Sequence, residues 1–315
     1  PRTSSAASDV YKRQTTNFYL FLFFRMLQAG VAAGFVLGRA VIRDIVPMEH
    51  AASMIGYVTM AMTIMPMLAP AIGGVLEEQL NWRYSLRLMY LMGIISLLLI
   101  WFDQKETLKK SDTSQTKLSE DYKELLLNTN FWFYVIVMGF SVGSYFSFLT
   151  GAPVISAEYF KLAPSVQGYL FAILGLGFFL GNFLTGRFAM KIGPNRFMLW
   201  GCFIALTGPL LQCLIYFNFT FSPLSFFAPM FLVGLGQGLI VPNAAAGIVS
   251  VNPKLAGSAS GLGATVQVLI GGILAYLTGY IISQFVSPLP LISILLLTIL
   301  VSMFFAYKLQ RGRSF

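Results

Sequence analysis

Arg25 is a cation deep inside an apolar segment. The segment reads Phe18-Tyr-Leu-Phe-Leu-Phe-Phe-Arg25-Met-Leu-Gln28 and stays apolar through Gly38. At the helical rise per residue, the guanidinium would lie about 10 Å into a bilayer. A charge at that depth is costly in hydrocarbon, so it should face a bundle interior or a watery cavity and have a partner there. The alternative is a structural arginine whose side chain reaches back to the membrane interface.

The composition predicts an all-α, polytopic membrane protein. Hydrophobic residues make up 57% of the 315 residues and charged residues 10%, and the mean hydropathy is +0.74. A soluble domain carries about a quarter charged residues. The formal charge of +9 does not indicate a nucleic-acid partner, because the basic residues fall between apolar segments. His50 is the only histidine, so we expect no metal site.

Hydropathy predicts membrane spans in two groups, separated by one charged segment. The spans are residues 18–42, 52–76, 85–102, 131–152, 166–188, 197–217, 224–250, 256–283 and 289–307. The segment 103–130 is rich in charge and nearly free of aromatic side chains, which predicts a cytoplasmic loop. The expected organisation is a leader of non-native, adapter-like origin (1–17), the remainder of an N-terminal bundle (18–102), this loop, a C-terminal six-helix bundle (131–308) and a cytoplasmic tail (309–315).

The second span carries a pattern of small residues and proline that resembles a known motif. It is similar to the antiporter motif in helix five of the major facilitator superfamily, Gly-x8-Gly-x3-Gly-Pro-x2-Gly-Gly. The positions in register that we assign to it are Gly56, Ala69, Pro70, Gly73 and Gly74. Met65 and Ala69 stand where the motif has glycine, and alanine keeps that helix face small. The resemblance implies a hinge between the two bundles, and we expect Gly73 to pack against Gly177 and Gly181.

A second motif is similar to one in helix four of the same family. Arg25-x-x-Gln28 resembles the pattern Arg-x-x-Gln-Gly, which in this family is linked to proton coupling, and the sequence continues Ala29-Gly30. With Arg39 to Asp44 downstream, this variant resembles the Bcr/CflA drug-resistance branch. A later segment resembles the second copy of the cytoplasmic loop motif after helix eight, at positions Gly186, Arg187, Gly193 and Arg196.

The resemblance implies a major facilitator fold with about nine of its twelve transmembrane helices present, from the fourth to the twelfth. It implies proton coupling through Arg25 and Gln28, with an acidic partner for Arg25 in the first three helices. It also implies a substrate site between two bundles. Tyr145, Gln237 and Asn243 are candidates for that cavity, and the alternative for each is a plain hydrogen bond between helices.

These residues favour a proton-coupled exporter of drugs or other small organic molecules in the inner membrane of a bacterium. We expect it to act as a monomer and to use a proton gradient, with no other cofactor. An importer of a small metabolite and an inactive fragment are the alternatives. A membrane-embedded enzyme is disfavoured, because the spans hold neither clustered carboxylates nor a histidine that could act in catalysis.

The distribution of basic residues predicts the orientation in the membrane. Most lysines and arginines of the connections lie on the side that includes residues 103–130 and the C-terminus, which places that side in the cytoplasm. In intact cells, an impermeant thiol reagent should therefore leave Ser111→Cys unlabelled and label Ser287→Cys. The reverse pattern would contradict this orientation.

Overall fold

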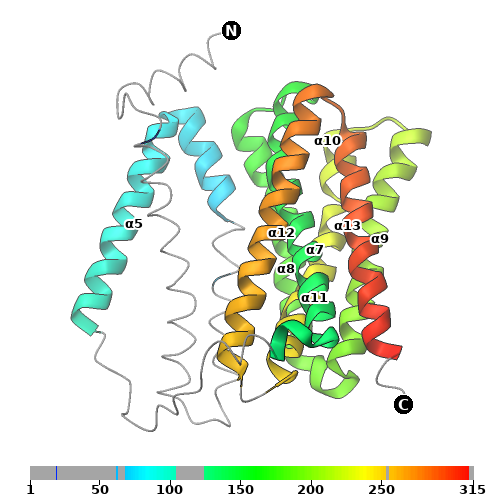
Figure 1. Ribbon diagram of the computed structural model, residues 1–315. Helices are drawn as coiled ribbons and strands as arrows, with labels where there is room; N and C mark the ends of the chain where they lie inside the picture. The colour runs from blue at the N-terminus through cyan, green and yellow to red at the C-terminus, as the bar shows by residue number, and fades with distance from the viewer. Residues whose placement is uncertain (1–18, 20–61, 63–67, 104–123, 253–254, 312–315) are drawn as a thin grey trace. The chain divides into compact units, whose positions relative to one another are not determined.

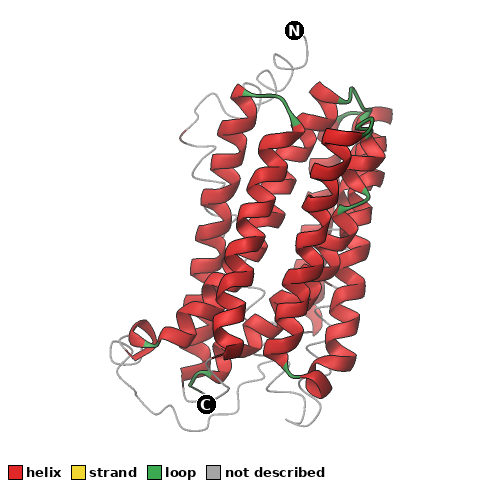
Figure 2. Ribbon diagram, turned by 90° about the vertical axis from the view of Figure 1, so that its right-hand side faces the viewer, coloured by secondary structure: helices red, strands yellow, loops and turns green. Residues whose placement is uncertain are grey.

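The computed structural model describes residues 19, 62, 68–103, 124–252 and 255–311 (Figure 1). Apart from Tyr19, they belong to one compact unit, that of residues 58–104 and 113–315. Among them the structure contains helices and short connections but no strand (Figure 2), so the predicted all-α fold class is confirmed. Arg25, Gln28 and Gly56 lie outside the described residues.

The described helices match the later predicted spans. They are α5 (Trp82–Asp103), α7 (Thr129–Val154), the π-helical turn η2 (Ile155–Tyr159), α8 (Pro164–Ile192), α9 (Pro194–Asn218), α10 (Pro223–Phe227), α11 (Met230–Ser250), α12 (Ala256–Gln284) and α13 (Pro288–Arg311). Residues 68–79 form a further helical segment before α5. Six of the described helical stretches, all between Thr129 and Arg311, are long and apolar enough to cross a membrane.

Local signals in the sequence set several helix ends. The side chain of Asn128 caps α7 by accepting a hydrogen bond from the backbone N–H of Phe131, at 3.1 Å. Pro164 and Pro194 open α8 and α9, where a missing N–H costs nothing. Gly193 joins these two helices with a φ of +95°, a conformation that favours glycine. α9 therefore begins directly after α8 ends.

Helix α11 lies at the centre of the C-terminal bundle and contacts α7, α8, α9, α10 and α12. Its most extensive contacts are with α8 and α9, while α12 and α13 both pack mainly on α7. At the end of the bundle where α10 lies, six phenylalanine rings pack together, with centroids 5.0 to 6.2 Å apart for adjacent pairs. They are Phe148, Phe160, Phe171, Phe221, Phe226 and Phe227. This aromatic cluster fills the space between the helix ends.

Glycines bring the backbones of α8 and α11 into direct contact. A Cβ placed on Gly177 would overlap the carbonyl oxygen of Phe231, and one on Gly181 would overlap that of Leu235. From the other side, a Cβ on Gly238 would lie 2.6 Å from the backbone nitrogen of Asn182. A side chain at these positions would force the helices apart, since such distances are well below van der Waals contact.

Candidate functional site

Apart from Gly56, the residues of the predicted hinge lie in the segment 68–79, and two glycines bring this segment against the start of α8. Gly74 is buried, and a Cβ added to it would overlap the carbonyl oxygen of Pro164. Gly168 lies one turn further along α8, and a Cβ there would overlap the carbonyl oxygen of Pro70. The two helices therefore touch backbone to backbone, each through a glycine of its own.

The prediction that Gly73 packs against Gly177 and Gly181 was wrong. A Cβ on Gly73 would have no atom within 4 Å, whereas Gly177 and Gly181 face α11. Successive residues of a helix point about 100° apart, so the face that meets α8 is that of Gly74. Of the other hinge residues, Ala69 is exposed and Pro70 is partly buried, and Pro70 supplies the carbonyl at the contact.

A polar contact joins α7 to α11 inside the bundle. The side-chain N–H₂ of Gln237 donates to the hydroxyl of Ser144 at 2.7 Å and to the backbone carbonyl of Ser141 at 3.1 Å. The hydroxyl of Ser144 donates to the same carbonyl at 2.7 Å. Gln237 is 4% exposed and Ser144 is fully buried. These bonds give Gln237 a role in holding two helices together, which is one of the two roles expected for it.

The other two cavity candidates make separate contacts. Asn243 is 4% exposed and donates to the carbonyl of Leu239 in its own helix, at 2.7 Å. Tyr145 is partly buried and lies beside the ring of Phe146. The three candidates thus stay candidates, each with its own surroundings.

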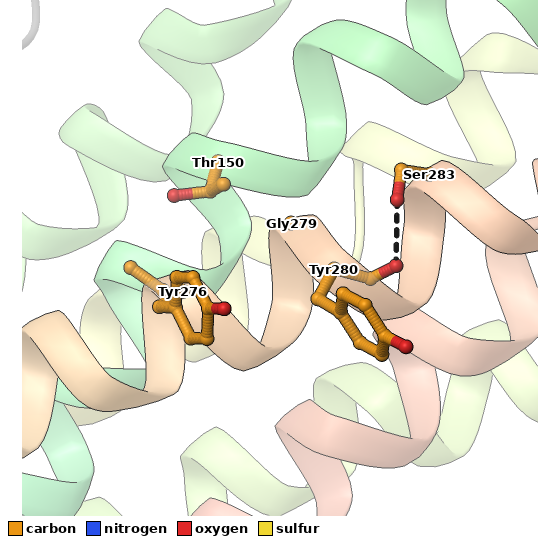
Figure 3. A pocket seen from close by; sticks show the side chains of 6 residues that line it. Thr150, Tyr276, Gly279, Tyr280 and Ser283 are labelled. Atoms are coloured by element: carbon orange, nitrogen blue, oxygen red, sulfur yellow. Dashed lines mark hydrogen bonds between the residues drawn. The ribbon is translucent and has the colours of Figure 1, made fainter.

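An open groove of about 470 Å³ lies between α7 and α12, and sequence reasoning did not propose a site there (Figure 3). It is lined by Thr150, Ala275, Tyr276, Gly279, Tyr280 and Ser283. The two tyrosines are more than half exposed. The hydroxyls of Thr150 and Ser283 donate to backbone carbonyls of their own helices. The two tyrosine side chains are therefore the main groups that the groove offers to a ligand. In the sequence, two tyrosines one helical turn apart beside small residues would have indicated this groove.

The residues that resemble the loop motif lie around the junction of α8 and α9. Arg187 and Arg196 are exposed, a Cβ on Gly186 would meet no atom within 4 Å, and Gly193 makes the turn. Sequence analysis did not single out Asn195, which links three helices there. It accepts a hydrogen bond from the hydroxyl of Tyr134 on α7 at 2.8 Å and donates to the carbonyl of Leu309 on α13 at 3.4 Å.

A metal site has no support in the part of the chain that the structure describes. Within it, no three side chains of His, Cys, Asp or Glu type lie close enough to hold an ion. The described membrane helices instead offer hydroxyl, amide and aromatic groups. Such groups can bind an organic molecule or tie helices together.

Comparison with known proteins identifies the family. The model of the Major Facilitator Superfamily matches residues 5–276. The chain belongs to this superfamily. The match begins inside the segment 1–17 that we expect to be a leader, so the extent of that leader stays a prediction.

Three relatives in the superfamily illustrate the similarity. The chain is 26% identical to an uncharacterized MFS-type transporter, YdgK, of Bacillus subtilis over 87% of its length, and 26% identical to a bicyclomycin resistance protein homolog of Haemophilus influenzae over 78%. It is 27% identical to multidrug resistance protein D of Escherichia coli over 79%. The chain spans 69% of the length of the first relative and 62% of each of the others.

The contact between Gln237 and Ser144 predicts an energetic coupling between the two side chains. Gln237→Leu and Ser144→Ala, made singly and together, should show a coupling of about 0.6 kcal/mol, and at most about 1.7 kcal/mol, in unfolding experiments in detergent. Gln237→Leu combined with Ser302→Ala is the matched control, because Ser302 bonds to Val137 elsewhere on α7. Additive effects of Gln237→Leu and Ser144→Ala would show that the hydrogen bond between these side chains does not contribute to stability.

Proposed function

We propose that this chain exports small organic molecules, drugs among them, in exchange for protons across the inner membrane of a bacterium. Membership of a transporter superfamily supports transport. The names of the second and third relatives, a bicyclomycin resistance protein homolog and a multidrug resistance protein, support efflux. The proposed transporter acts as a monomer, draws on the proton gradient without another cofactor, and has no enzymatic activity of its own.

The contact between residues 68–79 and α8 is the observation that carries the proposal. It brings two residues of the antiporter-like motif, Pro70 and Gly74, against the start of the C-terminal bundle, and the nearest neighbours of Gly74 and Gly168 across the contact are backbone atoms. Rigid-body rocking of two bundles about a substrate site is the transport mode of this architecture. A close contact through glycines suits rocking, because the helix backbones can change their angle while staying in contact.

The two alternative functions, an importer and an inactive fragment, can each be tested. An exporter would move its substrate against the flow of protons, whereas an importer of a small metabolite would move its substrate in the same direction as the protons. The direction of gradient-driven substrate flux in inverted vesicles therefore distinguishes an exporter from an importer. An inactive fragment would show no flux in either direction. It would, however, gain flux when preceded by the three helices that the sequence analysis expects.

Gly74 and Gly73 form a matched pair for testing the hinge. Gly74→Leu places a side chain against the backbone of Pro164, whereas Gly73→Leu meets open space. Overpacking by even a few methylenes costs about 1–3 kcal/mol. Gly74→Leu should therefore slow extrusion at least about fivefold, with Gly73→Leu close to wild type and both inserted equally in the membrane. Equal activity of the two variants would show that this contact is ordinary packing.

Arg25 is the test of proton coupling. A guanidinium does not deprotonate in proteins, so Arg25 would act by stabilising the ionised form of a neighbouring acid. In the chain preceded by the three expected helices, Arg25→Ala should stop gradient-driven extrusion of a fluorescent cation from inverted vesicles. Arg25→Lys should restore it only in part, because an ammonium lacks the planar fork. Full transport by Arg25→Ala would return this residue to a structural role.

A further inference from the structure

One end of the C-terminal bundle brings basic residues from three helices together. Asn195 ties the start of α9 to α7 through Tyr134 and to the last turn of α13 through Leu309. This is the lower end of the bundle in Figure 1, where α13 finishes. The positions held in this way are fixed by hydrogen bonds between helices, so the side chains around them form a defined surface.

Four exposed cations lie in the helix turns that meet at this end. They are Lys191 at the end of α8, Arg196 at the start of α9, and Lys308 and Arg311 in the last turn of α13. Residues 185–200 and 300–315 contain no aspartate or glutamate. The one described carboxylate near the start of α7, Glu124, accepts a hydrogen bond from Asn252. The surface therefore carries positive charge that its own segments do not neutralise.

Aromatic rings place these cations at the level of the lipid headgroups. The ammonium of Lys308 lies 4.8 Å from the ring centroid of Phe304 and 5.7 Å from that of Phe133, within the range of cation–π attraction. Trp200 and Tyr307 are about half exposed, and such residues favour the boundary between hydrocarbon and water. The aromatic side chains offer contact to the upper part of an acyl chain, and the cations face outward beside them.

We propose that this surface, formed by Lys191, Arg196, Lys308 and Arg311, binds the phosphate of an anionic membrane lipid. Arginine and lysine recognise phosphate by charge and by several N–H donors. Juxtamembrane cations attract anionic headgroups, and the neighbouring apolar rings favour a lipid over a free anion. The site is distinct from the hinge and the groove, so it stands whether or not the proposed transport activity holds.

Native mass spectrometry of the purified full chain tests this proposal by counting bound lipids. Phosphatidylglycerol should bind, whereas phosphatidylcholine and inorganic phosphate, each tested separately, should not. The double variant Lys308→Gln/Arg311→Gln should bind phosphatidylglycerol about 30-fold more weakly, since each cation near the surface is worth about fivefold. The charge-preserving variant Lys308→Arg/Arg311→Lys should bind like wild type.

The control variant removes the same charge from two positions outside this surface. Lys161 lies in the connection between η2 and α8, and Arg87 lies beside Tyr84 in a cation–π pair like that of Lys308. The double variant Lys161→Gln/Arg87→Gln should leave phosphatidylglycerol binding unchanged. The proposal is overturned if this control weakens binding as much, if phosphatidylcholine or phosphate binds as well as phosphatidylglycerol, or if the charge-preserving variant loses binding.

Discussion

In a bilayer the lipid tails are as apolar as leucine, so helices associate through close packing and hydrogen bonds rather than through the hydrophobic effect. Helix α11 meets this constraint on three sides. Gly234 and Gly238 let its backbone touch α8, and Gly236 lets it touch α9. Gln237, between two of these glycines, bonds to α7. Four positions within a stretch of five residues thus fix the place of the central helix, and the outer helices are arranged around it.

A close backbone contact at glycine also occurs where the segment 68–79 meets α8, with one glycine on each helix and a carbonyl oxygen of the other helix opposite it. Within the bundle such contacts are reinforced by buried hydrogen bonds, for example that of Thr185 on α8 to Gly238. At the Gly74 contact the described neighbours are backbone atoms of Pro164 and Ser165. A bundle whose helices are held together by such contacts and hydrogen bonds suits movement as a rigid body.

The sequence was sufficient to predict the six later membrane helices, because each is a continuous apolar segment bounded by proline, asparagine or charged residues. It was also sufficient to single out Gly177, Gly181 and Gln237 as positions of interest. It could not assign their partners, which depend on how each helix is rotated about its axis. A shift of one residue, from Gly73 to Gly74, changes the face that meets α8. The bridging role of Asn195 depends on helices far apart in sequence, and no local pattern marks it.

The central claim is that glycine-mediated backbone contacts hold α11 against its neighbours. The most direct measurement is the free energy of unfolding of the full chain in detergent for Gly177→Ala and Gly186→Ala, two substitutions in the same helix. Gly177→Ala should lower it by about 1–3 kcal/mol, because the new methyl meets the backbone of Phe231. Gly186→Ala meets open space and should be neutral or stabilising by about 0.5–1 kcal/mol. Equal effects of the two substitutions would contradict the account.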